Sequence, residues 1–297
     1  MREEDNIFPP FPLSGRLFCY KIVLKEGPPS LTGKTEKDLC MKLLVISDIH
    51  SNIWALEKIL DTEKSFDLLC CAGDLVDYGT APDKVVDCMR EYSSKILIQG
   101  NHDLHVVNTW KQDLYRDIAP KEYKWVHHNC LRLDADRIHY LEQLPSHLTF
   151  EADGYVYMIQ HQYDKAYGVI ESRYQFEGFW KAHAAQEYID SKKRRMIFGH
   201  THRQCIHILD QDVLWLNPGS ASYRRPDDPD KTAHYAVIEN GEIRLCRVPY
   251  DRSSLMEEAE KLNKVHGMMD TELQDFFFFF GDARTSRDPL PMEHEKI

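Results

Sequence analysis

The residues of this chain that are best suited to chemistry follow short apolar runs, as if each set stood at the end of a buried strand. Seven of them supply oxygen or nitrogen donors: Asp48, His50, Asp74, Asn101, His161, His200 and His202. Such donors suit divalent ions such as Mn²⁺, Fe²⁺ or Zn²⁺. Seven donors exceed the needs of one tetrahedral zinc ion, so the set favours two metal ions about 3.5–4 Å apart, bridged by a carboxylate.

The sequence GNHD at residues 100–103 poses a narrower question. A tight turn uses glycine, asparagine and aspartate, but it has no need of the histidine at position 102. Taken alone, the stretch is typical of a strand-to-helix loop with an incidental histidine. The other polar sets are what favour a functional role for it.

An alternation of elements explains how these sets could meet. Apolar runs at residues 42–48, 66–74 and 95–100 predict buried strands, and residues 52–64 and 81–93 between them predict helices. This order is typical of an α/β fold with a parallel sheet and crossover helices. Ligands bind beyond the carboxyl ends of the strands in such sheets, which is where the polar sets lie.

The rest of the chain continues the pattern with more strands. Strands are predicted at residues 155–160, 195–199, 213–219, 234–239 and 242–248, and helices at 136–145, 178–190 and 252–280. The ENGE turn at 239–242 predicts a hairpin. Residues i and i+2 of an extended chain point the same way. That alternation accounts for the spacing of Asp48 and His50, and of His200 and His202.

Three regions are expected. Residues 1–40, which are broken by prolines, form an extension outside the core, or translation begins at Met41; residues 41–250 form the main domain; and residues 251–297 form a helical segment with a polar tail. The run Phe276–Phe280 favours packing of a C-terminal helix on the domain, with a partner-binding patch as the alternative.

Composition narrows the class of protein. The net charge of −11 disfavours extended nucleic acid as a partner, and no stretch approaches the about 18 apolar residues of a membrane span. The eight cysteines form no C-x-x-C pair, and the N-terminus has no apolar signal region. We therefore expect reduced thiols, no membrane partner and a cytoplasmic location.

The ordered motifs D-x-H, G-D-x-x-D-x-G, G-N-H-D, a lone histidine and G-H-x-H resemble those of the calcineurin-like metallophosphoesterase superfamily. With NPGS at 217–220, the chain is similar to the small bacterial and archaeal phosphodiesterases of that superfamily. The resemblance covers residues 41–250. It implies an α/β sandwich of two mixed β-sheets flanked by helices, with a two-metal site at the carboxyl ends of the strands.

The resemblance also implies a role for each motif residue. One metal ion would be held by Asp48, His50, Asp74 and His202, and a second by Asp74, Asn101, His161 and His200. Mn²⁺ is the expected metal, with Fe²⁺, Zn²⁺ or Ni²⁺ as alternatives. A hydroxide bridging the metals would attack a phosphate ester, and His102 would act as general acid, oriented by Asp77. Asp103 would fix the loop through backbone hydrogen bonds.

Two departures from the family pattern bear on function. Tyr78 stands where protein phosphatases of the superfamily have arginine, which disfavours that activity, and Gln162 stands where glycine usually follows the lone histidine. A small phosphate ester, most readily a diester, is the expected substrate. A catalytically inactive scaffold is the alternative, but a scaffold has no need of His102. A DNA-repair nuclease is disfavoured by the acidic charge.

The remaining polar residues are assigned outside the site. We expect this of ten histidines: His105, His127, His128, His139, His147, His183, His207, His234, His266 and His294. The basic run at 192–195 is interpreted as a solvated loop. Arg224 and Arg225 are candidates for binding substrate charge, and residues 104–135 and 163–178 are expected to form the walls of the pocket.

Overall fold

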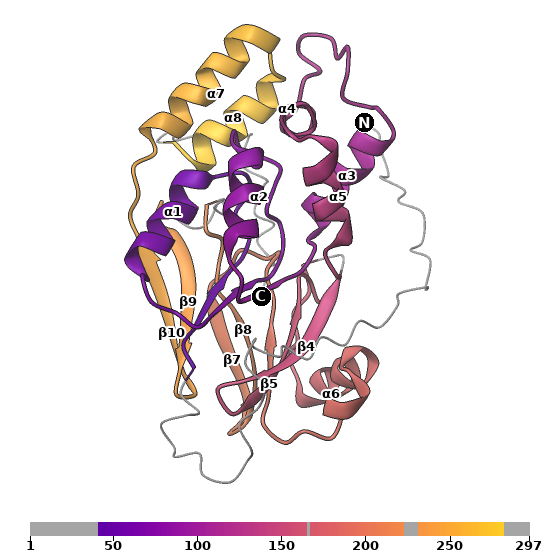
Figure 1. Ribbon diagram of the computed structural model, residues 1–297, viewed down its shortest axis with the longest axis vertical. Helices are drawn as coiled ribbons and strands as arrows, with labels where there is room; N and C mark the ends of the chain where they lie inside the picture. The colour runs from indigo at the N-terminus through magenta and orange to yellow at the C-terminus, as the bar shows by residue number, and fades with distance from the viewer. Residues whose placement is uncertain (1–40, 165–166, 223–230, 282–297) are drawn as a thin grey trace, which may run out of the picture.

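The computed structural model describes residues 41–164, 167–222 and 231–281 (Figure 1). The predictions for the extension 1–40, for Arg224 and Arg225, and for the tail 282–297 lie outside these residues. Every helix in the described part of the chain is too short or too polar to pass through a lipid bilayer.

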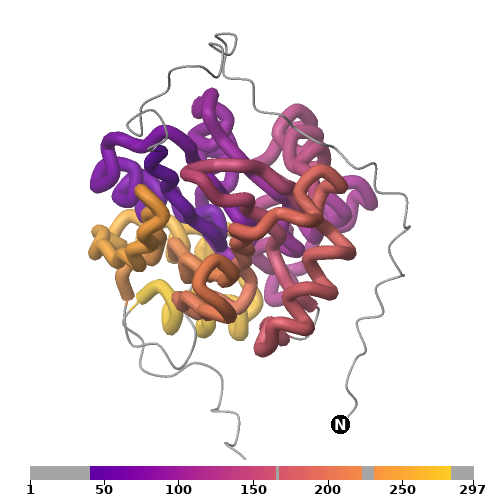
Figure 2. Tube along the Cα trace, turned by 90° about the horizontal axis from the view of Figure 1, so that it is seen from below, coloured from indigo at the N-terminus to yellow at the C-terminus, as the bar shows by residue number. Residues whose placement is uncertain are grey.

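The first sheet has five strands in the order β10-β9-β1-β2-β3. Its strands are β1 (Leu43–Ile46), β2 (Leu68–Cys71), β3 (Lys95–Leu97), β9 (Ala233–Glu239) and β10 (Glu242–Val248). The first three are parallel and are joined by α1 (Ile53–Thr62) and α2 (Pro82–Glu91). The hairpin β9–β10 returns antiparallel to β1, so amber C-terminal segments lie beside indigo N-terminal ones (Figure 2). Asn240 and Gly241 have positive φ, as the predicted hairpin turn requires.

The second sheet also has five strands, in the order β4-β5-β6-β8-β7. Its strands are β4 (His147–Ala152), β5 (Tyr155–Gln160), β6 (Arg194–Ile197), β7 (Cys205–Asp210) and β8 (Val213–Asn217). The three inner strands are parallel, and the edge strands β4 and β7 pair antiparallel to them. Neither β4 nor β7 was predicted from the sequence.

The two sheets pack face to face, which confirms the expected sandwich. Alternation along β1 sends Leu43 and Val45 to the core between the sheets, where they meet Tyr157 and Ile197 of the second sheet. Leu44, one position on, points to the opposite face, which α1 and α2 cover. A third core lies between the second sheet and α6 (Arg173–His183).

Two helices begin at residues for which no helix was predicted from the sequence. Asn101 opens α3 (Asn101–Lys111), so the GNHD stretch is a helix N-terminus and not only a loop. The helix predicted at 178–190 is α6, which begins at Arg173, and its C-terminal part is replaced by a short 3₁₀ turn (Gln186–Tyr188). Ser172 and Gln175 form a capping box that fixes the start of α6.

The C-terminal helical segment consists of two helices, α7 (Ser253–His266) and α8 (Asp270–Phe279), separated at Gly267, which has φ 64°. They lie beside α4 (Trp125–Arg132) at one end of the molecule, and α5 (Ala135–Gln143) follows α4 (Figure 1). The Trp125 and Phe276 rings stack with centroids 4.5 Å apart. Phe276, Phe279 and Phe280 are buried, as the packing interpretation of the phenylalanine run predicts.

The basic run at 192–195 was expected to form a solvated loop, and this prediction is wrong for its two arginines. Arg194 and Arg195 are buried in β6. Arg194 donates two hydrogen bonds to Glu177, at 2.7 and 2.6 Å. The Arg195 guanidinium lies 3.4 Å from the centroid of the Tyr155 ring and donates to the carbonyl of Gly241. Buried charges of this kind require such partners. The six cysteines among the described residues are free thiols.

Candidate active site

The polar sets that follow β1, β2, β3, β5 and β6 come together at one edge of the sandwich. All nine residues assigned a metal or acid–base role in the sequence analysis lie there. Asp48 and His200 lie 152 positions apart in the sequence, yet the backbone N–H of His200 donates a hydrogen bond to the carboxylate of Asp48 at 3.2 Å. The fold therefore brings the predicted set together.

The backbone at these positions is not the extended chain that the i, i+2 spacing suggested. β1 ends at Ile46 and β6 at Ile197, and the residues beyond them turn. Positive φ angles occur at Asp48 (54°), His50 (47°), Asp74 (56°), His200 (63°) and His202 (54°). Such conformations cost about 1 kcal/mol or more each in non-glycine residues, and they concentrate at functional sites. Left-handed turns, and not strand alternation, aim these side chains.

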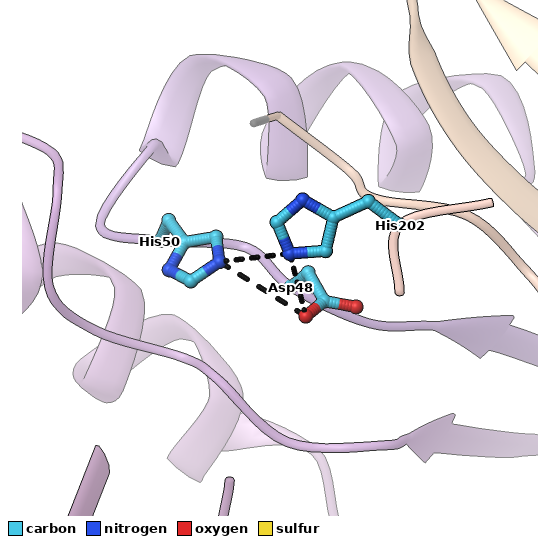
Figure 3. Close-up of side chains that lie close together, drawn as sticks. All are labelled: Asp48, His50 and His202. Carbon is cyan, nitrogen blue, oxygen red and sulfur yellow. Dashed lines mark hydrogen bonds and ion pairs between the residues drawn. The ribbon is translucent and has the colours of Figure 1, made fainter. Parts of the chain in front are cut away.

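The first donor group consists of Asp48, His50 and His202 (Figure 3). Nε2 of His202 lies 3.1 Å from Oδ1 of Asp48, and Nε2 of His50 lies 4.0 Å from the same oxygen. The two imidazole nitrogens are 3.4 Å apart. Two imidazoles and a carboxylate that converge in this way form a three-donor set for a divalent ion.

The second group is centred on Asp74. Nε2 of His161 lies 3.0 Å from Asp74 Oδ2 and 3.0 Å from Asn101 Oδ1. Nδ1 of His200 also lies 3.0 Å from Asn101 Oδ1. Asp74 Oδ2 is 3.9 Å from Nε2 of His50, so this carboxylate stands between the two donor groups. A carboxylate in this position could be shared by two metal ions.

Hydrogen bonds fix the orientation of His161. Its Nδ1 lies 2.6 Å from the carbonyl oxygen of Ala72, which can only accept, so Nδ1 carries the proton. Nε2 then faces Asp74 and Asn101 and is the atom that could bind a metal ion. A backbone carbonyl behind an imidazole is the usual support of a metal-binding histidine. The glutamine at position 162 therefore does not displace the lone histidine from the site.

Asp103 ties the loop after β2 to the start of α3. Its carboxylate accepts the backbone N–H groups of Asp74 (3.0 Å), Leu75 (2.8 Å), Val76 (3.1 Å) and Gly100 (2.9 Å). This confirms the prediction that Asp103 fixes the loop through backbone hydrogen bonds. The same loop receives a second restraint, because the N–H of His102 donates to Asp74 Oδ1 at 2.9 Å.

The glycine of GNHD is required by space and not by backbone conformation. Gly100 has φ −92°, which any residue adopts. A Cβ at this position would lie 2.0 Å from Asp74 Oδ1 and 2.3 Å from the Asp74 nitrogen. Glycine therefore permits α3 to begin directly against the central carboxylate.

His102 forms a separate pair with Asp77. Its Nδ1 lies 2.9 Å from Asp77 Oδ2, and its ring centroid is 5.2 Å from that of His50. His105, which the sequence analysis placed outside the site, shares the same carboxylate oxygen at 3.3 Å. Residues i and i+3 of a helix share a face. A prediction of α3 from residue 101 would have shown that His105 accompanies His102.

The histidines of the site differ in the direction in which their pKa values are shifted. Burial lowers the pKa of His50 to about 3 and that of His200 to about 4, so both imidazoles are neutral and hold a lone pair for a metal. Burial also opposes the charged forms of His161 and His102. The negative charge of Asp74 outweighs this effect and raises the pKa of His161 to about 10. Asp74 and the hydrogen bond to Asp77 together raise the pKa of His102 to about 9.

These observations allow a test of whether divalent ions fit the site. The buried carboxylates of Asp48 and Asp74 need positive charge beside them, and a divalent ion supplies it in place of a proton on His161. His200 Nε2 is buried and has no hydrogen-bond partner among the described residues. The donor set of carboxylates, imidazoles and one amide therefore fits divalent metal ions.

Two tyrosines stand beside the donor groups. The Tyr78 ring lies 4.6 Å from that of His102 and 5.4 Å from that of His50, measured between centroids. Tyr167 stacks on His200 at 4.6 Å and is 65% exposed. Tyr167 comes from the segment expected to form a wall of the pocket, although no pattern in the sequence marked it individually.

His128 supports the site from behind. It is buried and contacts the carbonyl oxygen of Thr80 through Nε2 at 2.9 Å. Asn129, its neighbour on α4, accepts the backbone N–H of Asp77 at 2.9 Å. The loop that carries Asp77 and Tyr78 is therefore held by α4, and no direct role in the site follows for His128.

Comparison with known proteins agrees with this fold. Residues 41–242 match the model of the calcineurin-like phosphoesterase superfamily domain, and the chain belongs to this superfamily. An uncharacterised protein of Methanocaldococcus jannaschii is 26% identical over 235 residues, which cover 74% of this chain and 92% of that protein.

Two solved structures share the fold. A metallophosphoesterase from Sphaerobacter thermophilus superposes with a TM-score of 0.57 at 20% identity, covering 80% of this chain and 98% of that one. A hypothetical protein from Pyrococcus horikoshii gives a TM-score of 0.61 at 14% identity, covering 81% and 98%. At these identities the likeness concerns the architecture.

Proposed function

We propose that this protein hydrolyses phosphate esters, with phosphodiesters and small phosphate esters as its substrates and two divalent metal ions as cofactors. The observation that carries the proposal is the position of Asp74 between two groups of donors, with the His102–Asp77 pair beside them. Membership of the calcineurin-like phosphoesterase superfamily supports the reaction class.

In this proposal, one ion is held by Asp48, His50, Asp74 and His202, and the other by Asp74, Asn101, His161 and His200. When bound, two divalent ions neutralise phosphate charge and lower the pKa of a coordinated water from 15.7 toward about 7. Mn²⁺ is the first choice, with Fe²⁺, Zn²⁺ and Ni²⁺ as alternatives, because the set mixes oxygen and nitrogen donors.

The chain's own acid is His102. Asp77 accepts a hydrogen bond from Nδ1 of His102 at 2.9 Å, which leaves Nε2 to hold the proton that the leaving oxygen needs. His102 is 21% exposed, so a substrate can reach it, whereas Asp77 is buried. General acid catalysis of this kind contributes about 10²–10⁴-fold to a rate. A scaffold would have no need of such a pair, which is why we favour an enzyme.

The substrate class is inferred from the net charge of the chain and from the side chains beside the donor groups. Tyr78 in place of arginine leaves no cation next to His102 on that loop, which disfavours recognition of phosphoproteins. The net charge of −11 disfavours extended nucleic acid. A small ester fits best, with Tyr78 beside His102 and Tyr167 beside His200 as candidate contacts for it.

The proposal is tested by assaying a panel of phosphodiesters and phosphomonoesters with Mn²⁺, Fe²⁺, Zn²⁺ and Ni²⁺, together with metal analysis. We expect metal-dependent hydrolysis, loss of activity in EDTA and about two metal ions per chain. Asp74→Asn should lose both ions, because the shared carboxylate serves both groups, and Asn101→Ala should weaken mainly one.

Asp113→Asn is the matched control for Asp74→Asn. Asp113 also has a left-handed backbone (φ 54°, against 56° for Asp74), but its side chain is 65% exposed. It should leave metal content and activity unchanged. Metal content that is the same in Asp74→Asn as in the unaltered protein, or no hydrolysis with any of the four metals, would leave the scaffold as the better account.

A further inference from the structure

The pair formed by His102 and Asp77 is part of a trio. Nδ1 of His102 and Nδ1 of His105 both approach Oδ2 of Asp77, at 2.9 and 3.3 Å, and one ligand atom from each residue lies within 4.8 Å of the other two. None of the three residues belongs to the donor groups around Asp48 and Asp74. We propose that Asp77, His102 and His105 form a third, inhibitory metal site that takes Zn²⁺.

The spacing of the trio suits zinc. Zn²⁺ binds imidazole nitrogen and carboxylate oxygen at about 2.0–2.2 Å with tetrahedral geometry, which places neighbouring ligand atoms about 3.3 Å apart. The two nitrogen–oxygen distances already measure 2.9 and 3.3 Å. Three protein ligands leave the fourth position for water or for a substrate oxygen.

The helix and the loop hold the ligands in place. His102 and His105 share one face of α3, and their rings meet edge to face with centroids 6.5 Å apart. Asp77 is anchored through its backbone N–H, which donates to Asn129. A zinc ion therefore needs only to replace the hydrogens that now lie between the nitrogens and the carboxylate.

The trio is also reachable and selective. The side chains of His102 and His105 are 21% and 44% exposed, while Asp77 is 4% exposed. An ion can enter from solvent and meet a buried charge. Two imidazoles with one carboxylate favour Zn²⁺ or Co²⁺ over Mn²⁺, whereas the two donor groups around Asp74 add its second carboxylate and the amide oxygen of Asn101, which suit Mn²⁺ better. Mn²⁺ that fills the Asp74 groups should therefore leave the trio open.

The consequence for activity rests on the proposed function. A zinc ion bound to Nδ1 of His102 takes the lone pair on that nitrogen, removes the hydrogen bond to Asp77 and excludes the doubly protonated ring. His102 then keeps one proton, on Nε2, but its release would leave a zinc-bound imidazolate, so the ring is a much weaker acid toward the leaving oxygen than the doubly protonated ring. Zinc should thus slow reactions that need an acid and spare those that do not.

Binding is tested on the full chain by titration with Co²⁺, followed by its visible absorption, and with Zn²⁺, followed by calorimetry. We expect about three ions per chain in the unaltered protein and about two in His105→Ala. Alanine is well tolerated on the exposed face of a helix. His139→Ala is the matched control, because His139 is 68% exposed on α5 beside only one carboxylate. It should bind the third ion as the unaltered protein does.

An equal number of ions in His105→Ala and in the unaltered protein would overturn the third site. This readout does not depend on hydrolysis, so a lost third ion in a protein without phosphoesterase activity would keep the site and reject the proposed function.

Inhibition is tested on the Mn²⁺-loaded protein by adding Zn²⁺, with each variant normalised to its own rate without zinc. For esters with alkoxide leaving groups we expect about 10²-fold inhibition, within the range of a general acid's contribution. With nitrophenolate leaving groups the inhibition should be small, and His105→Ala should abolish most of it for both. Equal inhibition in His105→Ala would show that zinc acts by displacing Mn²⁺ elsewhere, and would refute the inhibitory role.

Discussion

The carboxylate of Asp103 accepts the backbone N–H of Asp74 at 3.0 Å, although the two residues lie 29 positions apart in the chain. The same oxygen accepts the N–H of Gly100 at 2.9 Å. Asp103, which holds the backbone of Asp74, is therefore the neighbour of the proposed acid His102. The position of the Asp74 carboxylate and that of the acid both depend on the start of α3.

The first prediction concerns this restraint. Asp103→Asn places an NH₂ group where two backbone N–H groups now donate, so at least one buried donor loses its partner. We expect a loss of about 1–3 kcal/mol in the free energy of unfolding and weaker metal binding. Denaturant unfolding and metal titration measure both.

Asp134→Asn is the control for that change, because asparagine can also cap α5 by accepting the backbone N–H of Arg137, and the ion pair of Asp134 with the Arg137 guanidinium is exposed and contributes little. The free energy of unfolding of Asp134→Asn should stay within about 0.5 kcal/mol of that of the unaltered protein. If Asp103→Asn is no more harmful than Asp134→Asn, the restraint on Asp74 comes from elsewhere.

A second prediction concerns Gly100. Gly100→Ala would force a Cβ to within 2.0 Å of Asp74 Oδ1, so the carboxylate must move and metal affinity must fall. Gly178→Ala provides the contrast, since a Cβ there meets nothing within 4 Å and the residue lies inside α6. It should stabilise the protein by about 0.5–1 kcal/mol. Unchanged metal affinity in Gly100→Ala would show that Asp74 has room to shift.

A third prediction concerns pH. Burial lowers the pKa of His128 to about 4 in the folded protein. In the unfolded chain the imidazole has its ordinary pKa near 6.5, so between these two values it binds a proton only when the chain is unfolded. Stability from this residue is present above pH 6.5 and is lost as pH falls toward 4. His128→Gln removes the titration and keeps a donor for the carbonyl of Thr80.

The measurement is the difference in unfolding free energy between the unaltered protein and His128→Gln, with metal saturated, at several pH values. The unaltered protein should lose about 3 kcal/mol relative to the variant between pH 7 and pH 4. A difference that stays constant with pH would mean that His128 binds its proton in the folded state as well.

A fourth prediction separates the two interpretations of the phenylalanine run. Phe276 is buried against Trp125, so Phe276→Ala should cost about 3–5 kcal/mol in unfolding free energy. Val265→Ala, at a position that is 74% exposed on α7, should change it by no more than about 0.5 kcal/mol. A stable Phe276→Ala protein would favour a surface patch after all.

The sequence predicted the elements whose patterns are local. Buried runs such as LLVI and LLCC contain only apolar residues and cysteine, and they became β1 and β2. The edge strands β4 and β7 were missed, although Leu148 and Phe150, and Ile206 and Ile208, alternate with polar residues as half-covered strands do. Alternation over six residues is a weaker signal than a continuous apolar run.

The sequence predicted which motif residues lie close together, but not the geometry in which they meet. The motif residues come together as expected, but left-handed turns at Asp48 and His200 orient them, and such turns depend on contacts with distant loops. No motif marked His105 or Tyr167. The place of His105 depends on the helix start at Asn101, and that of Tyr167 depends on stacking against His200. Buried Arg194 and Arg195 were misassigned because partners such as Glu177 and Tyr155 are visible only in the fold.

The central claim is that His102 donates the proton to the leaving oxygen beside a two-metal site. It is tested most directly by measuring turnover against leaving-group pKa for the unaltered protein and for His102→Ala, both saturated with Mn²⁺. We predict that His102→Ala keeps its metal ions and its fold, loses about 10²–10⁴-fold with alkoxide leaving groups, and loses little with nitrophenolate. The slope for the variant should therefore be steeper. Parallel slopes, or loss of a metal ion from His102→Ala, would contradict the account.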